Sequence, residues 1–89
     1  MKGLIKKMEF VPKDNSNGVY FKKYNDNTII EVDFEKKTFH FGGKIKIYDK
    51  ELQNITKDED WVILECIDRL LTKGYKSEDI SLEKVYPTG

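Results

Sequence analysis

The sequence predicts an α+β domain in which an antiparallel meander of four to five strands is covered by one main amphipathic helix. Short runs rich in Ile, Val, Phe, Tyr and Thr fill residues 1–50, and Asn, Asp and Gly separate them, as is typical of strands and turns. A longer run with helical spacing occupies residues 57–73, and a final strand-like run follows at residues 81–86. With 89 residues, residues 1–89 are expected to form one small domain, β-rich in residues 1–50 and completed by residues 55–89.

Five strands are predicted in the first half of the chain, with a short connector leading from the last strand to the helix. Turn residues separate them: Pro12 and an Asp-Asn-Ser-Asn-Gly run after the first strand, and Asn-Asp-Asn after the second. The predicted strands are residues 4–10, 19–24, 28–34, 38–41 and 45–48.

Loop lengths predict how the last three of these strands pair, because cross-strand partners must point to the same face. A four-residue loop at residues 35–38 places Phe34 opposite Phe39. The next loop, Gly-Gly-Lys, has three residues with a bulge and places Phe41 opposite Ile45. The expected inner face consists of Ile30, Val32, Phe34, Phe39, Phe41, Ile45 and Ile47.

The main helix has a predicted start, stop and buried face. Thr56 and Glu59 fit a capping box, in which each side chain binds the other residue's backbone amide. Gly74 suits the left-handed position after the last turn, and Tyr75 is expected to pack on Leu70. The expected apolar stripe consists of Ile63, Cys66, Ile67, Leu70 and Leu71, widened by Trp61 and Leu64.

Composition limits the partners and the compartment. Sixteen basic and sixteen acidic side chains give zero net charge, so no overall field attracts nucleic acid or an anionic membrane. No run is long enough to span a bilayer, and the basic N-terminus lacks the apolar stretch of a signal peptide. The single cysteine, Cys66, falls within the helix stripe. We therefore expect a reduced, buried thiol in a cytoplasmic protein with no membrane partner.

The sequence pattern offers no catalytic or zinc-binding constellation. His40 alternates with Phe39 and Phe41, so it is expected on the polar side of its strand rather than in a catalytic pair. One His and one Cys are too few for structural zinc. The carboxylates of residues 58–60 lie in the first turn of the helix, where capping explains them without a metal. We expect no catalysis and no cofactor in this chain alone.

Tyr20, Lys22 and Tyr24 are the candidate nucleic-acid-binding residues. They alternate along one strand and therefore share a face, which is the solvent face if Phe21 points into the core. Exposed rings interleaved with basic side chains bind nucleic acid by stacking and charge. An ordinary strand with amphipathic tyrosines explains the same pattern and is the simpler interpretation.

Segments of the last third of the chain match a known family. The matching pieces are Trp-Val-Ile-Leu-Glu-Cys-Ile at residues 61–67, Leu-Leu and Lys-Gly-Tyr within residues 70–75, and Ile-Ser-Leu-Glu-Lys at residues 80–84. Together with the Gly-Gly-Lys-Ile run at residues 42–45, they resemble the endonuclease-like domain near the N-terminus of type I restriction-modification enzyme subunits, over residues 28–89. The resemblance implies an N-terminal module of a longer protein, truncated before the metal-binding Asp and Glu-x-Lys pair of that family.

The resemblance also implies one supporting site residue. The helix of that family often carries a glutamate facing the catalytic site, and Glu65 occupies the matching position. The plainer interpretation is a solvated Glu65 paired with Arg69 one turn later. Glu83 matches a further family position, although on a short strand the favoured interpretation is that its side chain faces water. A Mg²⁺ ion is implied only in a full-length parent, a nuclease or methyltransferase subunit.

Three functions are expected on these grounds. The first is a non-catalytic module of a restriction-modification subunit, with the other subunits and DNA as partners. The second is a stand-alone protein–protein interaction module that binds through a sheet edge or an aromatic patch. The third is a small nucleic-acid-binding domain that uses the strand with Tyr20, Lys22 and Tyr24.

Overall fold

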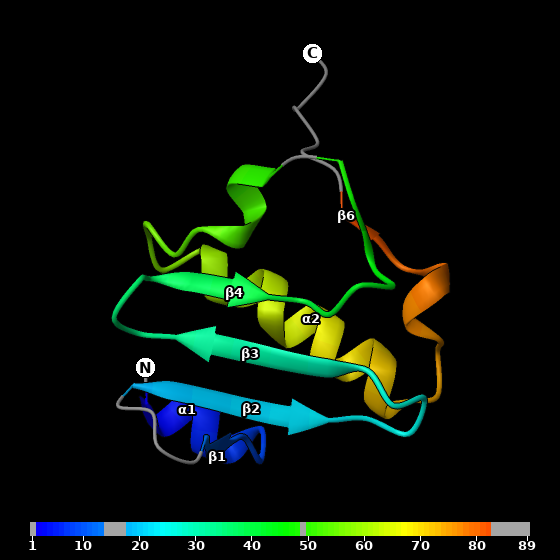
Figure 1. Ribbon diagram of the computed structural model, residues 1–89, viewed down its shortest axis with the longest axis horizontal. Helices are drawn as coiled ribbons and strands as arrows, with labels where there is room; N and C mark the ends of the chain where they lie inside the picture. Colours follow the sequence, from blue (N-terminus) through cyan, green and yellow to red (C-terminus); the bar gives the residue numbers. More distant parts are fainter. Residues whose placement is uncertain (1, 14–17, 49, 83–89) are drawn as a thin grey trace.

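A four-stranded antiparallel sheet with two helices on one face forms the fold, and this α+β architecture confirms the predicted fold class. The computed structural model describes residues 2–13, 18–48 and 50–82. Figure 1 shows the strand order β1-β2-β3-β4, with the helices α1 and α2 behind the sheet. In chain order the elements are α1 (Lys2–Lys7), β1 (Val11–Pro12), β2 (Val19–Lys23), β3 (Ile29–Asp33), β4 (Thr38–His40), β5 (Lys46–Ile47), the 3₁₀ turn η1 (Lys50–Gln53), α2 (Asp60–Thr72), the 3₁₀ turn η2 (Ser77–Asp79) and β6 (Ser81–Leu82).

The strand predicted at residues 4–10 is wrong, because helix α1 occupies most of this segment. Ile5 is fully buried, and Leu4 and Met8 pack partly buried against the core. Residues three and four positions apart share a face of a helix, and Met8 comes three positions after Ile5 and four after Leu4, so this short apolar run fits a helix that lies on the sheet. The run was too short for its helical period to be distinguished from a strand.

Both helices end in the same hydrogen-bonded stop. The N–H groups of Phe10 and Tyr75 donate to the carbonyl five residues earlier, at 3.0 and 3.1 Å. The residue before each has a positive φ, +68° at Glu9 and +105° at Gly74. The predicted stop at Gly74 is confirmed, although the Tyr75 side chain is largely exposed. A glutamate in the left-handed position carries no sequence signal, so the end of α1 could not be recognised.

β3 and β4 pair two residues away from the predicted register. Val32 lies opposite Phe39, and the loop of residues 34–37 begins one residue earlier than predicted. The Asp33 carboxylate causes this early turn, because it accepts two backbone N–H groups of the loop, each at 3.0 Å. A shift of two residues preserves side-chain alternation, so the predicted inner face is largely kept. Its buried members are Ile30, Val32, Phe39, Phe41 and Ile45.

The hairpin predicted between β4 and β5 is wrong. β5 leaves the sheet and pairs in parallel with β6, so Phe41 has no strand partner at Ile45. The edge of β4 is taken by the segment before α2, where Asn54 bridges Thr38 and the Ile55 N–H donates to the Lys37 carbonyl at 2.8 Å. A final strand is present, but only Ser81–Leu82 of the predicted residues 81–86 is described, and Glu83 lies outside the described residues.

α2 begins at Asp60 rather than at Lys57. The Asp60 carboxylate accepts hydrogen bonds from the Thr56 N–H at 2.7 Å, the Lys57 N–H at 3.0 Å and the Thr56 hydroxyl at 3.1 Å. Partial burial opposes ionisation of Asp60, but these hydrogen bonds outweigh it and lower the pKa of the carboxyl. Glu59, the predicted partner of Thr56, makes no side-chain cap bond. The predicted capping box is therefore wrong: Asp60 takes the place of Glu59 as acceptor of the Thr56 N–H, and the Thr56 hydroxyl donates to this carboxylate instead of accepting a backbone amide.

The face that α2 buries is rotated from the predicted stripe. Trp61, Leu64, Ile67 and Leu71 are buried against the sheet, whereas Cys66 is exposed and Leu70 is 36% exposed. The prediction of a buried Cys66 is therefore wrong. Trp61 anchors the helix, with its ring stacked on Phe34 at 5.7 Å and edge-on to Phe39 at 5.3 Å between centroids. The four buried residues all belong to the predicted set, and the helix carries a second apolar stripe, which explains why the sequence pattern also included Cys66 and Leu70.

Candidate interaction surfaces

Tyr20, Lys22 and Tyr24 lie on the side of the sheet that the helices cover. Their shared face is confirmed by the register of β2, but the expected side of the sheet is wrong, because Tyr24 is buried and Tyr20 packs against the core. The Lys22 ammonium lies 2.7 Å from the Asp68 carboxylate on α2, and the Tyr24 hydroxyl donates to the same oxygen at 2.6 Å. Nucleic-acid binding by these residues stays a prediction, and their exposed rings, on which it depended, are not observed.

The cluster around Asp68 is a polar link between the sheet and the helix. Burial raises the pKa of the Tyr24 hydroxyl, and the hydrogen bond and negative charge of Asp68 raise it further. The Lys22 ammonium also lies 5.0 Å from the centre of the Tyr24 ring, in cation–π range. Since Lys22 and Tyr24 on β2 both donate to one carboxylate on α2, this group holds the helix in position on the sheet.

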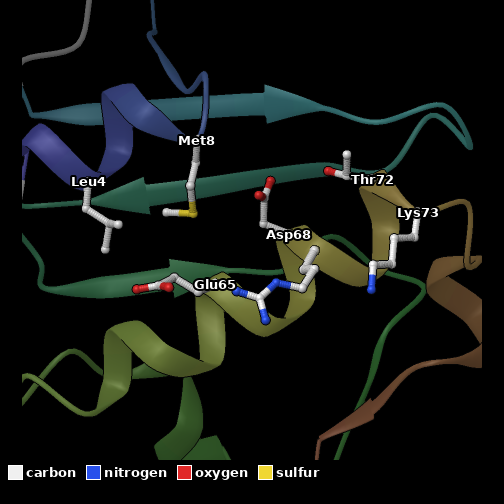
Figure 2. Close-up of a pocket in the computed structure, with 7 residues that line it drawn as sticks. Leu4, Met8, Glu65, Asp68, Thr72 and Lys73 are labelled. Carbon is white, nitrogen blue, oxygen red and sulfur yellow. The ribbon is translucent and has the colours of Figure 1, made fainter.

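Glu65 lines a cavity of about 330 Å³ between α1 and α2. Figure 2 shows Leu4 and Met8 on the α1 side and Glu65, Asp68, Thr72 and Lys73 on the α2 side. Arg69 also lines the cavity, yet no ion pair joins it to Glu65 in the described part of the chain. The predicted i,i+4 pair is therefore wrong. The lining mixes both charge signs with apolar carbons, which gives the site no single preference for a metal or an anion.

Carboxylates do not converge into a metal site within residues 2–13, 18–48 and 50–82. No group of three or more His, Cys, Asp or Glu side chains in these ranges is placed to hold a metal ion. The acidic residues of α2 point to different sides, with Asp60 in the cap and Asp68 toward β2. A Mg²⁺ ion in a longer parent protein stays a prediction.

A second buried polar cluster, which sequence analysis missed, joins the β2–β3 turn to η2. The Asp26 carboxylate accepts the Ser77 N–H at 2.8 Å and the Thr28 N–H at 3.0 Å, and the Thr28 hydroxyl donates to the Ser77 hydroxyl at 2.6 Å. The backbone hydrogen bond from Ser77 is the main cause that lowers the pKa of Asp26. The Asp-x-Thr sequence at residues 26–28 is a local signal for a turn, but nothing in the sequence indicates that Ser77, 51 positions after Asp26, binds it. The buried Ser77 hydroxyl is structural.

The second face of the sheet is not covered by any helix of the described residues. Strand register assigns its members, because partners on neighbouring strands share a face: Val11, Lys13, Val19, Phe21, Lys23, Ile29, Glu31, Asp33, Thr38 and His40. We call these residues the open sheet face. His40 is exposed here, as predicted, and its Nδ1 accepts the Gly42 N–H at 3.3 Å.

The open sheet face has an apolar centre with a charged rim. Val11 and Ile29 are 48% and 42% exposed, and half-buried Phe21 lies between them. A depression of about 350 Å³ is lined by Phe21 and Ile29 together with Lys13 and Glu31, whose charged groups pair at 2.9 Å. An apolar hollow bordered by one cation and one anion suits a hydrophobic side chain of a partner.

Comparison of the chain with models of protein families, with curated proteins and with solved structures found no match. The restriction-modification resemblance therefore stays a prediction. In the part of the chain that the structure describes, every helix is too short or too polar to cross a bilayer.

Proposed function

We propose that this chain is a non-catalytic protein-interaction domain that binds a protein partner through the open sheet face. One observation carries the proposal: Val11, Phe21 and Ile29, from three adjacent strands, place their apolar side chains together on the side away from the helices. Apolar anchors surrounded by polar groups are the usual composition of a protein interface. When only one face of a sheet packs on the core, a group of exposed apolar residues on the other face indicates a binding role.

The chemistry of the open sheet face indicates which kind of partner it fits. The depression between Phe21 and Ile29 fits an apolar side chain, and the pair of Lys13 and Glu31 at its rim offers one donor and one acceptor. The net charge of zero gives no long-range attraction to phosphate, so a protein surface is favoured over nucleic acid. The expected partner presents a hydrophobic residue flanked by polar groups of both signs.

The experiment places a photo-crosslinking amino acid at position 29 in cells that express the protein, with position 48 as the matched control, because Tyr48 is 66% exposed and belongs to neither the open sheet face nor α2. A partner captured at position 29 is then purified and titrated against the wild type, Ile29→Lys and Tyr48→Lys. We expect Ile29→Lys to weaken binding at least tenfold and Tyr48→Lys to leave it unchanged, because loss of a central anchor costs roughly 1 to 2 kcal/mol or more. Equal affinity of the wild type and Ile29→Lys would reject the open sheet face.

A second candidate is the N-terminal module of a restriction-modification subunit, contributing to DNA or subunit contacts. It is favoured by the order of α2, a glycine stop and β6, which agrees with the order of the matching segments, and by the place of Glu65 in the cavity between the helices. The coding sequence after codon 89 tests it: a downstream Asp and Glu-x-Lys pair is expected, and their absence from a longer reading frame would reject it.

A further inference from the structure

The exposed side of α2 carries a second apolar stripe. Val62 is 56% exposed, Cys66 is exposed and Leu70 is 36% exposed. These residues are four positions apart, so on a helix they fall within about 80° of arc. The residues that α2 buries against the sheet are Trp61, Leu64, Ile67 and Leu71, on the other side of the helix. The stripe therefore points away from the domain.

Charged residues extend the stripe symmetrically at both ends. Glu59 precedes Cys66 by seven positions and Lys73 follows it by seven, while Val62 and Leu70 are four positions before and after it. Glu59 and Lys73 are both exposed, and both have helical backbone angles. The ion pair of Glu59 with Lys57, at 3.5 Å, is itself solvent-exposed and contributes little. The exposed stripe thus has one apolar residue at equal spacing on each side of Cys66, with opposite charges at its two ends.

We propose that a second copy of this chain covers the exposed stripe, with two α2 helices antiparallel across a two-fold axis near Cys66. A two-fold interface must match its own surface. In the antiparallel arrangement Glu59 of one copy faces Lys73 of the other, and Val62 faces Leu70. A parallel pair would place Glu59 beside Glu59 and Lys73 beside Lys73, so the charges select the antiparallel arrangement.

The dimer is weak and is independent of the open sheet face. Glu59 and Lys73 are separated by roughly 21 Å along the helix, so one helix pair buries less area than a standard stable interface. We expect a dissociation constant of about 10 to 100 μM. Because the exposed stripe and the open sheet face lie on opposite sides of the domain, the dimer keeps both partner-binding faces accessible.

A charge-reversal cycle measured by sedimentation equilibrium tests the arrangement. Glu59→Lys and Lys73→Glu are each expected to weaken the dimer about five- to tenfold, because the symmetry repeats every like-charge contact twice. The double variant is expected to return to within about threefold of the wild type. Helix-dipole effects make both reversals unfavourable for α2, so the double variant cannot recover through better folding. A monomeric wild type at about 1 mM, or a double variant no stronger than the singles, would overturn the proposal.

Cys66 provides a second readout of the axis. A short bis-maleimide reagent should join two wild-type chains through Cys66, since its two copies meet at the two-fold axis. The control, Cys66→Ser combined with Lys23→Cys, presents its thiol on the open sheet face and should give no covalent dimer. Equal cross-linking of the two proteins would contradict the placement of the axis. Ile29→Lys should leave the dimer unchanged, which separates this proposal from the proposed function.

Discussion

Replacing Leu64 with alanine tests which side of α2 holds the fold together. Leu64 is fully buried in the core cluster, one turn from Trp61 and one turn from Ile67. Loss of the buried side chain and the cavity left behind cost about 3 kcal/mol in comparable sites. A domain of this size has a total stability of about 5 to 10 kcal/mol, so the change removes a large part of it.

The matched control is Leu70→Ala, which makes the same chemical change on the exposed stripe. Leu70 is 36% exposed, so its replacement should cost about 1 kcal/mol or less. Urea unfolding followed by the fluorescence of the single tryptophan, Trp61, measures both at a concentration where the protein is monomeric. With a slope of roughly 1 kcal/mol per molar urea, the midpoint of Leu64→Ala should fall by about 2 to 3 M. Equal losses in the two variants would refute the assigned buried face.

Two further predictions concern Tyr24 and Gly74. Because folding raises the pKa of Tyr24, the contribution of Tyr24 to stability is complete below its unfolded pKa of about 10 and is lost as the pH rises above that value. Urea unfolding from pH 8 to 12 should show this decline in stability, and Tyr24→Phe should reduce the decline. An unchanged decline in the variant would contradict the role of the Asp68 link. Gly74→Ala should cost about 1 kcal/mol of stability, measured by thermal unfolding, because φ is +105° at this position. The control, Gly43→Ala, lies at an open position without a positive φ and should change stability by less than about 0.5 kcal/mol. Similar losses in both variants would refute the role of Gly74 in ending α2.

Alternation along strands could be predicted from the sequence, and loop details could not. The inner face of β3 and β4 was predicted because Ile30, Val32, Phe39 and Phe41 alternate with polar residues. The exact register depended on the Asp33 side chain, which closes the loop one residue early. The edge of β4 is bound by residues 54–55, and β5 pairs with β6 instead. Contacts between segments so far apart leave no local pattern in the sequence.

The candidate sites show the same limit. The sequence established that Tyr20, Lys22 and Tyr24 share a face, but β2 has aromatic residues on both sides, so periodicity could not assign the buried one. The salt bridge between Lys22 and Asp68 decided this, and it joins residues 46 positions apart. The open sheet face and the exposed stripe became visible only after the buried sides of the sheet and α2 were known.

The edges of the sheet limit how this domain can recognise another chain. β1 is only two residues long and ends in Pro12, which has no N–H to offer to an added strand. The opposite edge, at Thr38, already bridges Asn54 of the same chain. An added strand from another chain therefore finds no free edge on either side of the four-stranded sheet. Recognition by strand addition is disfavoured, and the same obstruction discourages the edge-to-edge growth that leads small β-rich proteins into fibrils.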